Sequence, residues 1–246
     1  MKTKALIGVA IVLVFLAVLV IRLPAQWIVN FLPRDLVCED PSGTIWNGEC
    51  GALKLHAASF GTIDWTVAPG RLFAGKLVAD VSLTRPPSHA QGTVELSTSG
   101  TVIARALIAD FPIDPAIIPA LPENLAGRAH ADIALLKLHD SVIESIEGTI
   151  EVHDLAQGGA DAAALGDYSL VFPHSETAGE PLGHLRDLGG PLSVEATLKL
   201  TREPGFTLDG VLAARSSAPP QLAKDIESLG LPDSSGRRPF SIAGAL

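Results

Sequence analysis

The stretch Ser193-Val-Glu-Ala-Thr-Leu-Lys-Leu200 alternates strictly between polar and apolar side chains. Its apolar members are Val194, Ala196, Leu198 and Leu200. Because successive side chains of a β-strand point to opposite faces of the sheet, this period of two places all of them on one face. The stretch therefore predicts a strand of an antiparallel sheet that has one apolar face and one face in water.

The same period of two recurs along much of the chain. It is found at residues 62–67, 77–84, 94–96 and 150–152. Glycine tolerates the positive φ of tight turns, so we expect the glycines that precede apolar runs to mark the turns between strands. These glycines are Gly75, Gly92, Gly127, Gly148 and Gly210. Since the spacing is too irregular for a solenoid repeat, we predict a mainly β fold, a long and curved antiparallel meander.

Three segments depart from this pattern. Residues 219–230 place Leu222, Ile226 and Leu229 on one helical face, between prolines and a glycine, so we predict one short helix there. Residues 112–122 contain four prolines and are expected to form a connector or an isolated helical turn. Residues 174–190 are expected to form a surface loop.

Composition is that of a globular protein. Of the 246 residues, 47% are hydrophobic and 18% are charged, which argues against extended disorder. Only 5% are aromatic, so the core must be built largely from Ala, Leu, Ile and Val. The formal net charge is −9 and there is no basic patch, so we do not expect nucleic acid among the partners.

An uncharged apolar run, Ala5–Ile21, lies near the N-terminus. As a helix it would be about 25 Å long, near the lower limit for crossing a bilayer. Lys2 and Lys4 precede it, so the positive-inside rule predicts a cytoplasmic N-terminus and an exported remainder. A cleaved signal peptide is the alternative, but the residues after the run offer no small-x-small cleavage site. Trp27 would lie near the outer membrane–water interface.

The expected organisation therefore has three parts. They are a cytoplasmic tail at 1–4, a transmembrane anchor at 5–23 and an exported β-rich domain at 24–246. No second long apolar run is present, which indicates a single-pass membrane protein.

Patterns typical of catalysis are hard to find. The seven histidines form no HExxH motif, and the chain has neither a GxSxG nucleophile elbow nor a phosphate-binding loop. His56, His130 and His153 fall on the polar side of the alternation, where a solvated side chain is the expected interpretation and a metal ligand the alternative. We therefore expect no enzymatic activity, no cofactor and no bound metal.

Cys38 and Cys50 are the only cysteines. In an oxidising compartment they favour a disulfide, worth about 2.5–3 kcal/mol on the chain-entropy model, and two buried free thiols are the alternative. If Pro41-Ser42 and Asn47-Gly48 both formed two-residue hairpin turns, the cysteines would lie roughly 9.5 Å apart, too far to bond. A disulfide therefore requires a loop or bulge between them.

Between the cysteines lies Ser42-Gly-Thr-Ile-Trp-Asn-Gly48, and Ile63-Asp-Trp65 and Ala68-Pro69 follow. With the N-terminal span before them and residues 229–246 after them, these motifs resemble protein N of the bacterial type II secretion system along the whole chain. The signature residues are Ser42, Gly43, Thr44, Trp46, Asn47, Gly48, Asp64, Trp65 and Pro69. We interpret them as structural, and expect Trp46 to anchor the first strands in a core poor in aromatic residues.

The resemblance implies a bacterial inner-membrane protein with a β-rich periplasmic domain and no enzymatic activity. It further implies a place in the machinery that moves folded proteins through an outer-membrane secretin. Its partners would be other secretion components, either the secretin or inner-membrane platform proteins.

Three functions are compatible with these patterns. The first is a structural component of the secretion system that docks its partners through exposed sheet edges. The second is a periplasmic lipid-handling or lipid-transfer protein, which requires an apolar sheet groove that no helix covers. The third is a periplasmic hydrolase, which requires a converging polar pocket. The residues favour the first function.

Overall fold

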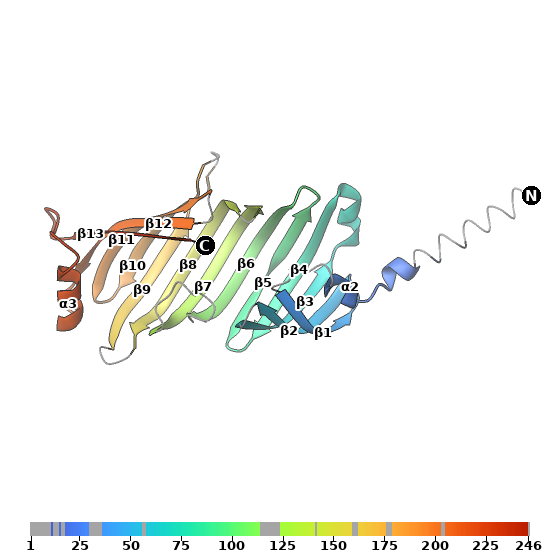
Figure 1. Ribbon diagram of the computed structural model, residues 1–246, viewed down its shortest axis with the longest axis horizontal. Helices are drawn as coiled ribbons and strands as arrows, with labels where there is room; N and C mark the ends of the chain where they lie inside the picture. The colour runs from blue at the N-terminus through green and yellow to red at the C-terminus, as the bar shows by residue number, and fades with distance from the viewer. Residues whose placement is uncertain are drawn as a thin grey trace, which may run out of the picture. The chain divides into compact units, whose positions relative to one another are not determined.

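The computed structural model of the protein describes residues 11, 15, 18–29, 36–55, 58–113, 124–140, 142–158, 162–175, 179–202 and 205–245. The chain divides into two compact units, Met1–Arg85 and Pro86–Leu246. In each unit the strands are antiparallel and pair with their neighbours in chain order (Figure 1). The prediction of a mainly β antiparallel meander is therefore confirmed.

Unit 1 holds a short helix, a 3₁₀ helix and the first strands of the chain. Its elements are α2 (Gln26–Val29), β1 (Leu36–Gly43), β2 (Asn47–Leu55), β3 (Ala58–Val67), η1 (Pro69–Ala74) and β4 (Lys76–Arg85). Gly43 pairs with Gly48, and Asn47 pairs with Thr66 at the end of β3. The β1–β2 turn and the β3–β4 connection through η1 therefore lie at the same end of these strands.

Unit 2 holds the later strands and helix α3 (Figure 1). Its elements are β5 (Ser88–Ser97), β6 (Thr101–Ile113), β7 (Leu125–His139), β8 (Val142–Gln157), β9 (Ala163–Phe172), β10 (Leu182–Gly189), β11 (Leu192–Thr201), β12 (Gly205–Ala214), α3 (Pro220–Glu227) and β13 (Arg238–Ala245). The predicted helix near the C-terminus is thus confirmed as α3.

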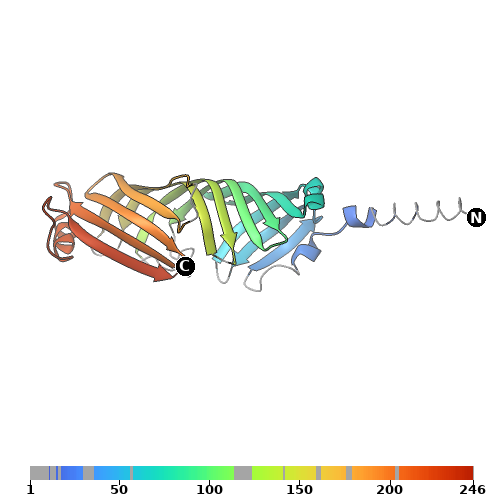
Figure 2. The same ribbon diagram turned by 90° about the horizontal axis from the view of Figure 1, so that it is seen from above.

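Helix α3 covers part of the apolar face of unit 2, at the end that carries the last strands (Figure 2). Ile226 of α3 forms a buried cluster with Tyr168, Leu192 and Val194, and Leu222 packs against the same cluster. The apolar residues of β11 lie on the face of the strand that packs against α3. They share this face because side chains alternate between the two faces of a strand.

Most of the predicted anchor at 5–23 lies outside the described residues, and so do Lys2 and Lys4. Residues 18–21 form a helical turn whose apolar side chains are exposed. Within the described part of the chain, no helix has the length and apolarity needed to cross a membrane.

The prediction that glycines mark turns is wrong at several positions. Gly75 ends η1 directly before β4, as expected, but Gly92, Gly148 and Gly210 lie inside strands. Gly148 has a φ of +146°, and a Cβ there would lie 2.3 Å from the carbonyl oxygen of Asp132. Glycine at such a position permits a bulge or a close backbone approach without ending the strand.

The predicted loop at 174–190 is partly wrong, because β10 occupies Leu182–Gly189. In β10 the alternation of apolar and polar residues is interrupted in the sequence by Gly183 and Asp187. Gly183 lies under the ring of Phe172, where a side chain would collide, and Asp187 stands opposite the buried Tyr168. Of the proline-rich segment at 112–122, residues 112 and 113 belong to β6 and the rest lies outside the described residues.

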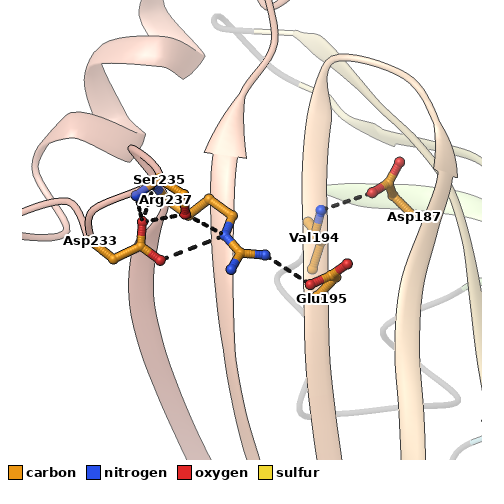
Figure 3. A network of polar contacts seen from close by, with 6 residues as sticks. All are labelled: Asp187, Val194, Glu195, Asp233, Ser235 and Arg237. Carbon is orange, nitrogen blue, oxygen red and sulfur yellow. Dashed lines mark hydrogen bonds and ion pairs between the residues drawn. The ribbon is translucent and has the colours of Figure 1, made fainter.

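Asp187 can lie on the core side of the sheet because hydrogen bonds and an ion pair with Arg215 stabilise its negative charge there. Its side chain is 11% exposed. Oδ2 accepts a hydrogen bond from the Val194 N–H at 3.0 Å (Figure 3). Oδ1 accepts from the Gly189 N–H at 3.2 Å and from Arg215 Nη2 at 2.6 Å. Burial opposes the ionisation of Asp187, but the Val194 N–H and Arg215 outweigh it and lower the pKa of this carboxyl. Burial also raises the pKa of Tyr168, to about 12.

We expect Asp187→Asn to lower the free energy of unfolding by about 1–3 kcal/mol, because charged hydrogen bonds are lost in a sheltered site. The pKa of Asp187 is lower in the folded state than in the unfolded state, where it is about 3.9. The ionised carboxyl therefore contributes its full stabilising free energy above the unfolded-state pKa. This contribution is lost as the pH falls through the folded-state pKa. Thermal unfolding at a series of pH values should therefore show a weaker acid dependence in the variant.

Asp154→Asn is the matched control, because Asp154 also pairs with an arginine, Arg128, but its side chain is 71% exposed. An exposed pair contributes at most about 1 kcal/mol, so this variant should unfold nearly as the parent does. Equal stabilities for the two variants would contradict the role given to Asp187.

Candidate functional site

The signature residues 42–48 build the β1–β2 turn. The Thr44 N–H donates to the carbonyl oxygen of Asn47 at 2.8 Å, and the Thr44 hydroxyl oxygen accepts from the N–H groups of Trp46 and Asn47 at 3.3 and 3.1 Å. Gly43 has a φ of +81°, and a Cβ there would lie 2.6 Å from the carbonyl oxygen of Asn47. The residue types of the motif are thus those that this turn requires.

Cys38 and Cys50 are joined by a disulfide, with their Cα atoms 5.7 Å apart. Neither Pro41-Ser42 nor Asn47-Gly48 forms the whole of a turn, because these residues lie in β1 and β2. Instead, Asp40 has a φ of +53° and interrupts the β1–β2 ladder between the two cysteines. This distortion is the departure from a regular hairpin that the disulfide requires.

The chain that precedes α2 docks on the signature turn. The Ala25 N–H donates to the carbonyl oxygen of Gly43 at 3.1 Å, and the Ile45 N–H donates to the carbonyl oxygen of Leu23 at 3.0 Å. Pro24 pairs with Thr44 in an isolated β-bridge. Residues 23–25 are therefore added to the turn as a short strand would be.

Two indole groups complete this joint. The Trp46 Nε1–H donates to the carbonyl oxygen of Val20 at 2.9 Å, and the Trp65 Nε1–H donates to that of Ile45 at 3.2 Å. Gly48 lies under the Trp65 ring, where a Cβ would be 2.5 Å from Cζ2. The carbonyl groups in the last turn of a helix need donors from outside it, and Trp46 supplies one.

Trp46 thus joins the N-terminal helical turn to the sheet, a role that the sequence did not indicate. The contact spans residues far apart in the sequence, so no local pattern could have predicted it.

The other signature residues do not take part in this joint. Asp64 is on the exposed side of β3, where the Ser82 hydroxyl donates to it at 3.5 Å. Pro69 begins η1, a position that suits its fixed φ. Trp27, which is not a signature residue, lies on α2 and is 56% exposed.

Several histidines in the strands of unit 2 pair with carboxylates. Asp110 of β6 stands between two of them: Oδ2 is 3.0 Å from His89 Nε2, and Oδ1 is 2.9 Å from His130 Nδ1. His153 Nε2 is 3.4 Å from a glutamate on its own strand. No group of His, Cys, Asp and Glu among the described residues could hold a metal ion, and His56 lies outside them.

His89, Asp110, His130 and Glu151 belong to a single row that runs across the strands of unit 2. In register order the row is His89, Asp110, His130, Glu151, Ser169, Arg186 and Glu195. Arg237, which Asp233 and Ser235 hold in place, reaches Glu195 at 2.8 Å (Figure 3). Directly opposite residues share a face, and a slip of one residue would carry this row to the apolar face, so the row helps to specify register.

An open pocket of about 1190 Å³ lies between the β7–β8 turn and the β9–β10 connection. Two glutamates that line it are paired with lysines: Glu144 lies 2.8 Å from Lys137, and Glu180 lies 2.6 Å from Lys199. The hydrogen bonds from the lysines lower the pKa of both glutamates. A hydrolase would instead use a raised carboxyl pKa or an activated nucleophile, so these glutamates form a charged rim.

Strand β13 is an unprotected sheet edge. Within the described residues it pairs with β12 alone, and beyond Arg238 and Pro239 at its start, residues 240–245 carry neither a charge nor a proline. By contrast, β1 carries Glu39, Asp40 and Pro41, together with the backbone distortion and the disulfide. Charges, prolines and kinks hinder pairing with another chain, whereas a regular uncharged edge accepts an added strand. The structure therefore offers β13 as a docking edge.

We expect Trp46→Phe to loosen the N-terminal joint, because the ring is kept while the hydrogen bond to Val20 is lost. Amide hydrogen exchange of the full chain in detergent should become faster at residues 18–25, and stability should fall by about 0.5–1.5 kcal/mol. Trp65→Phe is the control, because the hydrogen bond lost there connects β3 to Ile45 and does not reach residues 18–25. Unchanged exchange at 18–25 in Trp46→Phe would contradict the joint.

We expect replacement of Cys38 and Cys50 together by serine to lower the free energy of unfolding by about 2.5–3 kcal/mol, because the unfolded chain regains its loop entropy. Denaturant unfolding with and without reductant measures this difference. Reductant should destabilise the parent and leave the double variant unchanged. Two free thiols in the parent, found by non-reducing mass mapping, would contradict this expectation.

Comparison with known proteins places the chain in a family. The family model described as "Type II secretion system (T2SS), protein N" matches residues 34–241. The chain is 24% identical over 259 residues to the type II secretion system protein N of Aeromonas hydrophila, and 25% identical over 257 residues to that of Vibrio cholerae. Each match covers 100% of both chains. No solved structure matches. Since the matched range includes the signature turn and most of both units, the chain belongs to the protein N family of the type II secretion system.

Proposed function

We propose that this chain is a non-enzymatic, single-span inner-membrane component of the type II secretion system, and that it supports the export of folded proteins through the outer-membrane secretin. Residues 24–246 lie in the periplasm, where β13 docks another secretion component by strand addition. Family membership supports the assignment to the secretion machinery, and the uncharged edge of β13 is the observation that carries the docking mechanism.

The sequence and the signature turn support the anchored topology. Ala5–Ile21 is uncharged, and Lys2 and Lys4 before it favour a cytoplasmic N-terminus. The backbone hydrogen bonds of residues 23–25, and that from Trp46, join the N-terminal segment to the sheet without a free linker. Such a joint is useful where the segment continues into a bilayer, because it couples the orientation of the sheet to that of the membrane helix.

The chemistry of β13 supports a strand as the docking partner. Ser241 donates its hydroxyl hydrogen to Asp209 on the neighbouring strand, and Ile242 is 51% exposed on the other face. An added strand would gain backbone hydrogen bonds along an edge whose two faces differ in polarity. The backbone would supply affinity, and the alternating side chains would supply specificity.

The two alternative functions have less support. Lipid handling requires an open apolar face, but α3 covers part of that face in unit 2 and neither relative is named for such a role. A hydrolase requires poised acid–base groups, whereas the glutamates in the open pocket are paired with lysines. We therefore propose neither.

The docking mechanism is tested by Ala243→Lys, which places a charge in the middle of β13. When this variant replaces the chromosomal gene, we expect release of folded exoproteins to fall severalfold, because a charged edge opposes strand addition. Site-specific cross-links from β13 to the secretin or to platform proteins should be lost. Ala134→Lys is the matched control, because it adds the same charge at an exposed position of the interior strand β7.

Thermal unfolding and immunoblotting of both variants establish that each folds and accumulates. Normal secretion and normal cross-linking in Ala243→Lys would contradict docking through β13. Envelope lipid composition is measured in the same cells and should not change. Altered lipids with normal secretion would overturn the secretion assignment in favour of lipid handling.

A further inference from the structure

The 3₁₀ helix η1 lies at the end of unit 1 where the N-terminal segment docks. It connects β3 to β4 at the strand end that also carries the signature turn. The Val67 N–H, just before η1, donates to the carbonyl oxygen of Trp46 at 2.7 Å, which ties the two regions together. Figures 1 and 2 both show η1 and α2 at the end of unit 1 from which the N-terminal segment leaves.

The side chains of η1 are exposed, and two of them are large and apolar. Phe73 is 97% exposed and Leu72 is 41% exposed, and η1 has no buried residue. Trp27 of α2 and Leu77 at the start of β4 are also exposed at this end. Single exposed apolar residues need no explanation, but a group of them beside the entry of an apolar segment indicates a surface that contacts something.

The charge around η1 differs from that of the chain as a whole. Arg71 and Lys76 stand on either side of Phe73, and residues 65–79 contain no acidic side chain, although the chain has a net charge of −9. Aromatic and basic side chains side by side are typical of segments that lie in the headgroup layer of anionic membranes.

We propose that η1 is a second membrane contact, which places Phe73 and Leu72 in the headgroup layer of the bilayer that receives the N-terminal helix. Arg71 and Lys76 then lie near lipid phosphates. The inference rests on the anchored topology proposed above. The bilayer is the occupant because the Trp46 joint holds the N-terminal helix at this end, so an anchored chain brings η1 to the membrane surface.

A second contact has a mechanical consequence. A single helix leaves the attached domain free to tilt and to rotate about the helix axis. Contact through η1 would restrict both motions and would orient the strands of unit 1 relative to the membrane.

Nitroxide labels on the full chain test the proposal. Phe73→Cys, Thr84→Cys and Val18→Cys are each labelled with the native disulfide intact, and each protein is placed in bilayers of phosphatidylethanolamine and phosphatidylglycerol. Collisions with oxygen, which enters the bilayer, and with a water-soluble nickel complex report the depth of each label. Thr84 is an exposed control at the other end of β4, about 26 Å from the start of that strand.

We expect oxygen collisions to dominate at Val18 and Phe73, and nickel collisions to dominate at Thr84. Adding Arg71→Glu and Lys76→Glu to Phe73→Cys should move its label severalfold toward nickel accessibility, because the carboxylates repel anionic lipid. A water-exposed label at Phe73 together with a buried label at Val18 would contradict the membrane contact of η1 but not the anchored topology. In that case the exposed apolar side chains of η1 would be assigned to a protein partner. Water-exposed labels at both positions would overturn the anchored topology itself.

Discussion

Hydrogen bonding between strands that are consecutive in the chain is the constraint on which each unit depends. A meander of this kind has few contacts beyond the neighbouring strand, so the correct register at every pairing is essential. Alternation of apolar and polar residues enforces this register on one face, because a slip of one residue would expose the core positions. On the other face, the row from His89 to Glu195 opposes any slip through its cross-strand pairs.

The signature turn is the second essential element, because it connects two parts that no regular ladder joins. Gly43 and Thr44 shape the turn, residues 23–25 add to it, and Trp46 reaches the helical turn before them. The signature motif, which we interpret as structural, therefore joins the N-terminal segment to the sheet. The disulfide lies a few residues away, where Asp40 distorts the strand, and it strengthens the same part of unit 1.

The two ends of the chain have complementary properties. The first strand carries charges, a proline and a disulfide, all of which discourage pairing with another chain, whereas the last strand has Arg238 and Pro239 only at its start and carries no charge from there on. At the N-terminal end, by contrast, apolar and basic side chains gather around η1 and α2. Together these features support the proposal that the protein is attached to a membrane near one terminus and docks a partner near the other.

Local patterns in the sequence were sufficient to predict most strands, the helix α3 and the signature. The reason is that alternation, helix capping and turn chemistry each act over only a few residues. The same patterns failed at Gly148 and in β10, where a bulge or a buried charge overrides the local preference. Only the folded chain decided that Trp46 would reach Val20, that the cysteines would meet across Asp40, and that separate histidines and carboxylates would form one row. Each of these contacts depends on register and on backbone distortions between segments distant in sequence, and neither can be read from the period of a single strand.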